Sequence, residues 1–133
     1  QGVVVYQQAS DAVREQRTDV VCQEFMPGEG CDLNLFAYPA GHVKAIAVLQ
    51  TTRTRDGITR NAENIQRVVR RDMVELGIRV TRTLKLEGPV AIDMRRDRNG
   101  VPQVLGINAR IGANMMGSEE ILESFIMTAF EGD

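Results

Sequence analysis

Cysteine and histidine are scarce in this chain, and each scarcity excludes a class of site. The 133 residues include 2 cysteines and 1 histidine. Two cysteines are too few for a disulfide framework, and the spacing of Cys22 and Cys31 is not that of metal ligands. Because the one histidine, His42, lies in a predicted turn, we expect no Ser-His or Cys-His catalytic pair. We expect both cysteines to be reduced and packed, which suits a cytoplasmic protein.

Long apolar runs and lysine are scarce as well. No apolar stretch approaches the ~18 residues needed to cross a bilayer, so we expect no membrane partner. The net charge of −2 gives no electrostatic reason to expect nucleic acid as a partner. Of the 16 basic residues, 2 are lysine, so 14 are arginine. Guanidinium groups suit phosphate and carboxylate, so one interpretation is a phosphate-handling surface; the other is a GC-rich genome that encodes arginine in place of lysine.

Hydrophobic patterning predicts a mixed order of strands and helices. β-Branched runs and alternating residues predict strands at residues 2–6, 19–25, 31–38, 43–50, 88–94 and 101–108. Three stretches are typical of helices: one capped at Ser10 or Asp11, one over 70–84 and one over 117–130. The Arg-rich stretch 51–61 is typical of a loop. Antiparallel hairpins with helices on one side of the sheet predict an α+β fold.

Two details of this pattern bear on packing. Gly77 lies inside the helix predicted over 70–84 and should weaken it by roughly 1 kcal/mol relative to alanine. Phe125, Met127 and Phe130 recur near the end of the last predicted helix, where we expect them to pack into the core; the weaker alternative is that they pack on a partner. Because the first residues already predict a strand, we expect the sequence to be a segment of a longer protein or to lack upstream residues.

Asp93 and Asn108 lie on the two strands of a predicted hairpin whose turn signal is Asn99-Gly100. A tight hairpin places Asp93 across from roughly residues 106–108, so its carboxylate and the Asn108 amide oxygen could converge on one face. Magnesium prefers such oxygen ligands. An equally open interpretation is an exposed Asp93 balanced by Arg95 and Arg96, with an asparagine that ends a strand.

Longer motifs give a more specific pattern. The stretch "EGPVAIDMRRDRNGVPQVLGINARIG" resembles the magnesium-binding hairpin of the ATP-grasp superfamily. Upstream, "VVCQEFMPGEGCDLNLFA" resembles the hinge strand of that superfamily, and "GVVVYQQASDAV" resembles the strand and helix after its glycine-rich loop. The pattern covers nearly the whole chain. The nearest relatives are expected among the large chains of carbamoyl-phosphate synthase and related carboxylate–amine ligases.

The resemblance implies an α+β fold with an ATP-grasp-like antiparallel sheet and flanking helices, as an incomplete ATP-grasp unit. Residues 1–26 would be the end of the lid subdomain and the hinge strand, and residues 27–133 the C-terminal catalytic subdomain. The upstream half of the unit, with its phosphate-binding lysine, is expected to come from a missing part of the protein or from a partner chain. A homodimer is left open.

The resemblance also implies a site for ATP and Mg²⁺. Asp93 and Asn108 match metal-ligand positions, and Arg110 matches the arginine near the transferred phosphate or acyl group, which makes it the expected catalytic residue. Gly106 stands where the family places the glutamate that bridges the magnesium ions. Since that carboxylate is missing, we expect magnesium binding to be weakened.

The expected nucleotide contacts come from three segments. The linker that meets adenine corresponds to Glu24, Phe25 and Met26. Gly30 stands where relatives often carry an acid for the ribose hydroxyls, for which Glu29 or Asp32 could substitute. Phosphate contacts are expected from the arginine-rich loop, with Arg55 the representative among Arg53, Arg55 and Arg60.

Two functions follow from this set. One is the ATP-binding portion of a ligase, in which ATP converts a small carboxylate to an acylphosphate that an amine or thiol attacks. The alternative is a degenerate, non-catalytic ATP-grasp domain with a nucleotide-binding or structural role, for which Gly106 is the main support. An interaction domain without nucleotide is a third and weaker interpretation.

Overall fold

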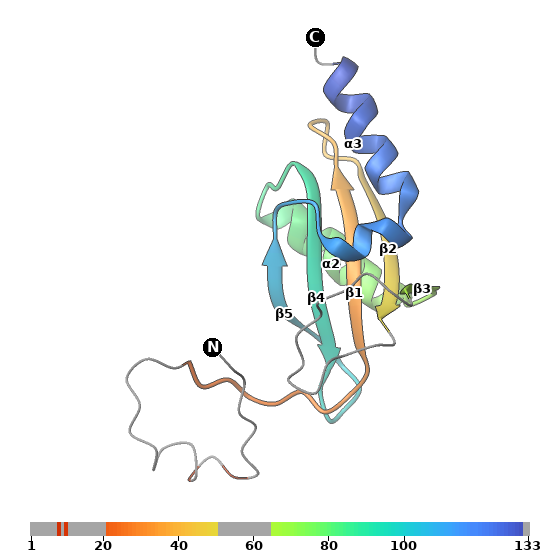
Figure 1. Cartoon of the computed structure of the whole chain (residues 1–133). Coiled ribbons are helices and arrows are strands. Elements are labelled where there is room, and N and C mark those ends of the chain that lie inside the picture. Colours follow the sequence, from red (N-terminus) through yellow and green to blue (C-terminus); the bar gives the residue numbers. More distant parts are fainter. Residues whose placement is uncertain (1–7, 9, 11–20, 51–64, 132–133) are drawn as a thin grey trace.

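The computed structural model describes residues 8, 10, 21–50 and 65–131, and within them the chain forms one antiparallel sheet with two α-helices (Figure 1). The elements are β1 Gly30–Ala37, β2 Val43–Gln50, β3 Ile65–Val68, α2 Arg71–Thr83, β4 Gly88–Arg96, β5 Pro102–Asn108, the 3₁₀ helix η1 Ala113–Gly117 and α3 Glu119–Glu131. The strand order is β3-β2-β1-β4-β5, and each neighbouring pair is antiparallel. The predicted α+β class is confirmed.

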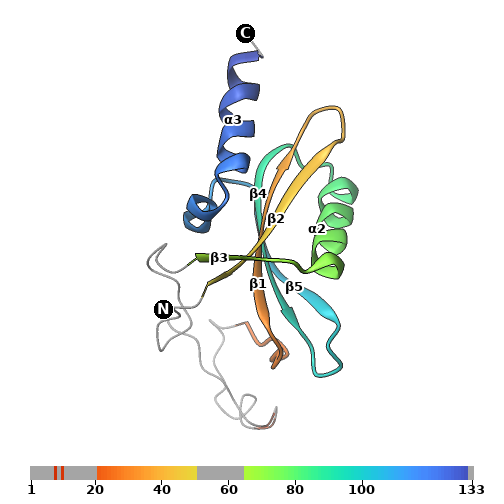
Figure 2. The same ribbon diagram turned by 90° about the vertical axis from the view of Figure 1, so that its right-hand side faces the viewer.

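The two helices cover opposite faces of the sheet. Figure 2 shows α2 on one side of the strands and α3 on the other. The alternation of β1 explains this arrangement: Leu33 and Leu35 pack in the cluster that includes Met73 of α2, while Phe36 packs with Ile121 of α3. The prediction of helices on one side is therefore wrong, because β1 is buried on both of its faces.

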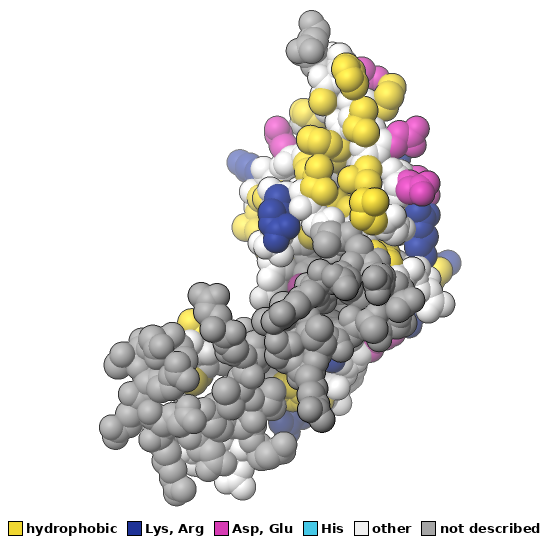
Figure 3. Space-filling model, in the orientation of Figure 1, with side chains coloured by type: hydrophobic (Ala, Val, Ile, Leu, Met, Phe, Trp, Pro, Cys, Tyr) yellow, Lys and Arg dark blue, Asp and Glu magenta, His cyan; other side chains and the backbone are white. Residues whose placement is uncertain are grey.

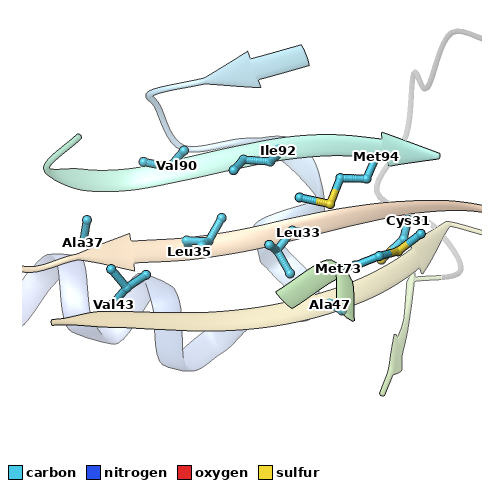
Figure 4. Packing of buried hydrophobic residues seen from close by; sticks show 10 residues of the cluster. All are labelled: Cys31, Leu33, Leu35, Ala37, Val43, Ala47, Met73, Val90, Ile92 and Met94. Carbon is cyan, nitrogen blue, oxygen red and sulfur yellow. The ribbon is translucent and has the colours of Figure 1, made fainter. Parts of the chain in front are cut away.

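The main core lies between α2 and the sheet, and Figure 4 shows the side chains of its buried members. Its buried members are Cys31, Leu33, Leu35, Ala37, Val43, Ala47, Met73, Val90, Ile92 and Met94. Gly77 is buried at the point where α2 crosses β1, and an added Cβ there would overlap the Leu33 side chain. The glycine that costs helix propensity therefore permits the close approach of helix and sheet.

Several sequence predictions on element positions need correction. Residues 21–25 form no strand, because no neighbouring strand in the described part of the chain pairs with them. Cys22 is exposed, in contrast to the expected packing, whereas Cys31 is buried. The short strand β3 was not predicted. Residues 2–7, 9, 11–20 and 51–64, with the predicted first strand, nearly all of the first helix and the arginine-rich loop, lie outside the described residues.

The predicted last helix is divided into η1 and α3, and much of its apolar surface faces outward. Hydrophobic side chains gather along α3 in Figure 3. Phe125, Met127 and Phe130 are exposed, Phe130 to 76%. Their expected core role is wrong for this structure, since only Ile121 among the large apolar residues of α3 is fully buried. Among the described residues, no helix is long and apolar enough to span a membrane.

Candidate functional site

A polar row crosses the sheet on the face that carries η1 and α3. Asp32 of β1 lies directly opposite Asp93 of β4, and Asp93 lies opposite Gly106 of β5. On the other side of Asp32 the row continues through Val48 to Arg67. Since cross-strand partners share a face, the two carboxylates and the bare backbone at Gly106 stand side by side.

A bulge sets the register of the β4–β5 hairpin. Asp93 pairs with Gly106 and Met94 with Val104, so the ladder is irregular at this point. Beyond it, Asn108 pairs with Ala91, which packs in the cluster on the η1 and α3 face. Asp93 and Asn108 therefore share a face as diagonal neighbours, in agreement with the sequence-based expectation for the hairpin.

Gly106 leaves open space on this face. A Cβ built at Gly106 would meet no atom within 4 Å. A larger side chain at this position would enter the row beside Asp93. The structure therefore has room for a glutamate at position 106, where this chain carries glycine.

The 3₁₀ helix η1 contacts the row through Asn114. The Nδ2 group of Asn114 donates a hydrogen bond of 2.5 Å to Oδ2 of Asp32. Asn34, the next residue on the same face of β1, is fully buried; its Nδ2 donates to the Asn114 carbonyl at 3.2 Å and to the Ser118 hydroxyl at 3.0 Å. These three polar residues hold η1 against the sheet. Because Asn114 is held in this way, its hydrogen bond also keeps the Asp32 carboxylate in place.

Sequence reasoning missed Asn34, Asn114 and Ser118 as parts of this arrangement. The available signal was an asparagine in the middle of an apolar strand, since a buried amide requires hydrogen-bond partners. Its partners lie 80 and 84 residues further along the chain, so local patterning could not identify them.

Arg110 lies in the exposed turn after β5. Its backbone N–H donates to the Asn108 carbonyl at 2.8 Å, which brings the chain round directly after the candidate ligand. Its guanidinium Nη1 donates to the Ile111 carbonyl at 3.1 Å. The tight turn thus keeps Arg110 near Asn108, and the proposed contact with a transferred group remains a prediction.

Residues 21–29 lead into β1 without forming a helix or strand. Glu24 and Phe25 are exposed, and Met26 is partly buried. The segment is attached to β4, because the Gly28 N–H donates to the Arg96 carbonyl at 2.9 Å and the Arg96 N–H donates to the Glu29 carbonyl at 3.0 Å. Contacts from the linker to adenine remain a prediction. Arg53, Arg55 and Arg60 lie outside the described residues.

Glu29 and Asp32 belong to opposite faces of the sheet. Arg70 forms two hydrogen bonds to the Glu29 carboxylate, at 2.5 and 2.8 Å, and this arginine holds the pKa of Glu29 below its usual value. Arg96 lies 3.9 Å from Glu29 and pairs with Asp72 of α2. This network lies toward α2, so of the two acids considered for the ribose, only Asp32 shares a face with Asp93.

The fold resembles that of a known ligase. A comparison with solved structures matches the chain to the crystal structure of L-amino acid ligase from Bacillus licheniformis, with a TM-score of 0.53 and 18% sequence identity. The match covers 69% of this chain but only 24% of that ligase. No family model matches the sequence, and a search of curated proteins gave no match. At this identity the likeness is one of fold, and the predicted ATP-grasp-like α+β fold is confirmed.

Proposed function

We propose that the chain is the ATP- and Mg²⁺-binding portion of an ATP-dependent carboxylate–amine or carboxylate–thiol ligase, similar to carbamoyl-phosphate synthase, that acts through an acylphosphate. The observation that carries the proposal is the placement of Asp32, Asp93 and Asn108 on one face beside the open space at Gly106. The fold likeness to an L-amino acid ligase supports it. In this proposal, residues 1–26 end the lid and hinge, and residues 27–133 form the catalytic subdomain.

The donor set fits magnesium only in part. Among the described residues, no group of three or more His, Cys, Asp or Glu side chains could hold a metal ion. Asp93 and Asn108, with Asp32 beside them, offer two carboxylates and one amide, and Mg²⁺ completes such sets with phosphate oxygens and water. Metal binding at this face should therefore depend on the nucleotide.

The side chains then have separate roles. Asp93 and Asn108 would hold Mg²⁺, which supplies charge neutralisation at the phosphates when bound. Asn114 keeps the Asp32 carboxylate in place through its 2.5 Å hydrogen bond. Arg110, in the turn two residues after Asn108, is the proposed catalytic contact to the transferred phosphate or acyl group, since a guanidinium stabilises the charge that develops there.

Calorimetry of ATP binding, with and without Mg²⁺, tests the proposal on this chain and on Gly106→Glu. We expect measurable ATP binding, with a greater dependence on Mg²⁺ in Gly106→Glu because a third carboxylate joins the row. Asp93→Asn should remove most of the dependence of ATP binding on Mg²⁺. Glu123→Gln, which changes an exposed acid on α3, is the matched control and should leave it unchanged.

If neither form binds ATP, the measurement is repeated on a longer chain that includes the upstream half of an ATP-grasp unit. Binding there would show that this chain supplies only part of the nucleotide site. Failure of that longer chain as well would refute the nucleotide proposal and leave the fold likeness alone.

Gly106 favours one alternative, a degenerate domain that binds nucleotide without catalysis. It predicts ATP binding that does not change with Mg²⁺ in the natural chain, and no turnover of ATP with any small carboxylate. The natural chain separates the two functions, because the ligase proposal expects ATP binding that depends on Mg²⁺ and the degenerate domain expects ATP binding that does not.

A further inference from the structure

Strand β2 is only half paired on its outer side. Along its inner side, residues 43–48 pair with β1, whereas on the outer side β3 pairs only with residues 47–50. No strand in the described part of the chain lies against the outer side of residues 43–46. Figure 2 views this edge directly and shows the open half of β2 between α2 and α3.

The open edge presents backbone hydrogen-bonding groups in strand geometry. The Tyr38 N–H donates to the His42 carbonyl at 2.8 Å, so the backbone groups of His42 face β1. Alternation then directs those of Lys44 and Ile46 toward β1 and those of Val43 and Ala45 away from it. Ala47, the next outward-facing residue, pairs with Val68 of β3. An added strand would therefore continue a ladder that β3 has begun.

A groove follows the open edge on the side of α2. It has a volume of about 360 Å³, and its apolar lining includes Ala45, Ala47, Val68 and Val74. Small side chains on β2 leave room above the strand, and Val74 of α2 forms the opposite wall. Since side chains of a strand alternate between its two faces, every second side chain of an added strand would enter this groove.

The rim of the groove is rich in arginine. Arg71 and Glu75 line the first groove, and a second one of about 410 Å³ continues from Glu75 past Arg79 and Arg82. Within the described residues, Arg71 and Arg79 have no carboxylate partner. The Arg82 Nε group donates to the Gly41 carbonyl at 3.4 Å, at the far end of the edge. The surface thus favours a negatively charged occupant.

We propose that the outer edge of residues 43–46 and the arginine-lined groove bind an extended acidic segment of a partner protein by strand addition. Main-chain hydrogen bonds supply the pairing, and acidic side chains meet Arg71 and Arg79. A second copy of this chain is disfavoured, because joining two β2 edges would bring one arginine rim against the other. The surface lies across the sheet from the β4–β5 hairpin, so the inference does not rest on the proposed nucleotide site.

Fluorescence anisotropy tests the inference on the whole chain with the labelled peptide Glu-Thr-Val-Thr-Val-Thr-Glu, in which the glutamates and valines share the face that enters the groove and the threonines point away from it. We expect saturable binding that weakens as salt rises to 0.5 M, because the charges are exposed. A matched peptide with lysine in place of glutamate should bind at least about tenfold more weakly. Methylation of alternate backbone nitrogens in the acidic peptide should have a similar effect, because it removes the donors that pair with the edge.

Variants locate the binding surface. Ala45→Pro removes an outward N–H and leaves the hydrogen bonds to β1 in place, so the sheet should fold and the peptide should bind about tenfold more weakly. Arg79→Glu should weaken binding of the acidic peptide and strengthen that of the lysine peptide. Arg98→Glu, in the turn between β4 and β5, is the matched control and should change neither.

Amide hydrogen exchange tests the inference on the natural chain, so it does not depend on whether Ala45→Pro folds. In the natural chain, the Val43 and Ala45 amides should exchange quickly and become protected when the acidic peptide binds. Equal affinity for both peptides, or unchanged exchange at these two amides, would overturn the inference. Sedimentation that shows a dimer abolished by Arg79→Glu or Ala45→Pro would also overturn it and identify a second copy as the occupant.

Discussion

Gly77 sets the distance between α2 and the sheet. It lies in the middle of the helix and is buried against β1, where an added methyl group would overlap the Leu33 side chain and approach Met94. In sequence terms a glycine inside a helix is only a cost, because it lacks the propensity of alanine. The structure shows a packing role that no helical pattern could reveal.

Gly77→Ala should therefore destabilise the chain. The gain in helix propensity is at most about 1 kcal/mol, whereas overpacking of a core costs about 1–3 kcal/mol, so the net free energy of unfolding should fall. Urea denaturation measures it. Gly106→Ala is the control, since its Cβ has open space, and it should leave stability within about 0.5 kcal/mol. A Gly77→Ala chain as stable as the natural one would contradict the packing described for α2.

Asn34 joins β1 to η1, which lies on the α3 face of the sheet. It is fully buried, and its amide donates to the Asn114 carbonyl and the Ser118 hydroxyl. Asn34→Ala should lower the free energy of unfolding by about 1–3 kcal/mol, because both acceptors lose a donor in a buried place. It should also raise the mobility of η1. Denaturation with urea and amide exchange of Met115 check the two effects; exposed Arg98→Ala is the control.

Elements with a local sequence signal were predicted from the sequence, and elements that depend on distant partners were not. β1, β2, α2 and the β4–β5 hairpin lie within a few residues of their predicted bounds, because alternation, helical periodicity and the Asn99-Gly100 turn are all local signals. β3 has four residues and, among the described strands, pairs only with β2, so it gives no periodic signal. Residues 21–25 have strand composition, but no strand in the described part of the chain pairs with them.

The edge strand β3 is attached to α3 by an ion pair. Arg67 donates two hydrogen bonds to the Glu120 carboxylate, at 2.5 and 2.6 Å, and its Nε donates to the Gly117 carbonyl. This arginine lowers the pKa of Glu120 from 4.5 to about 2. A lowered pKa in the folded state stabilises the fold above the ordinary pKa. That contribution is lost as the pH falls from about 4.5 to about 2.

Removal of the guanidinium should return Glu120 to ordinary titration. In Arg67→Gln, the pKa of Glu120 should rise toward 4.5, because the principal hydrogen-bond donor is gone. NMR titration of the Glu120 side chain measures this pKa directly. In the matched variant Arg98→Gln, the pKa of Glu120 should stay near 2. A low pKa that persists in Arg67→Gln would show that another group holds the carboxylate.

At the scale of the whole molecule, the sequence identified the hairpin of the candidate site but not its surroundings. Asp93 and Asn108 could be placed on one face because the turn fixes the pairing of two adjacent strands. That Asp32 stands directly beside Asp93 depends on the order of strands in the sheet, since β1 pairs with β4 across more than 50 residues of chain. The face covered by α3 likewise depends on tertiary packing.

Nucleotide binding should stabilise the whole chain. A ligand present at 100 times its dissociation constant adds about 2.7 kcal/mol to the free energy of unfolding, so ATP with Mg²⁺ should raise the melting temperature. With Asp93→Asn, the rise caused by Mg²⁺ should disappear while any rise caused by ATP alone remains. Differential scanning calorimetry with ATP in EDTA supplies the control. An equal rise in Asp93→Asn would remove Asp93 from the proposed metal ligands.

The two cysteines differ in exposure, so their reaction with a thiol reagent can report on the stability of the core. Cys22 is exposed, whereas Cys31 lies inside the core between β1 and α2, and burial raises the pKa of its thiol to about 11. A thiol reagent should therefore modify the chain in two phases, one immediate and one limited by opening of the core. The slow rate reports how often β1 separates from α2, and Cys22→Ser should leave only that phase.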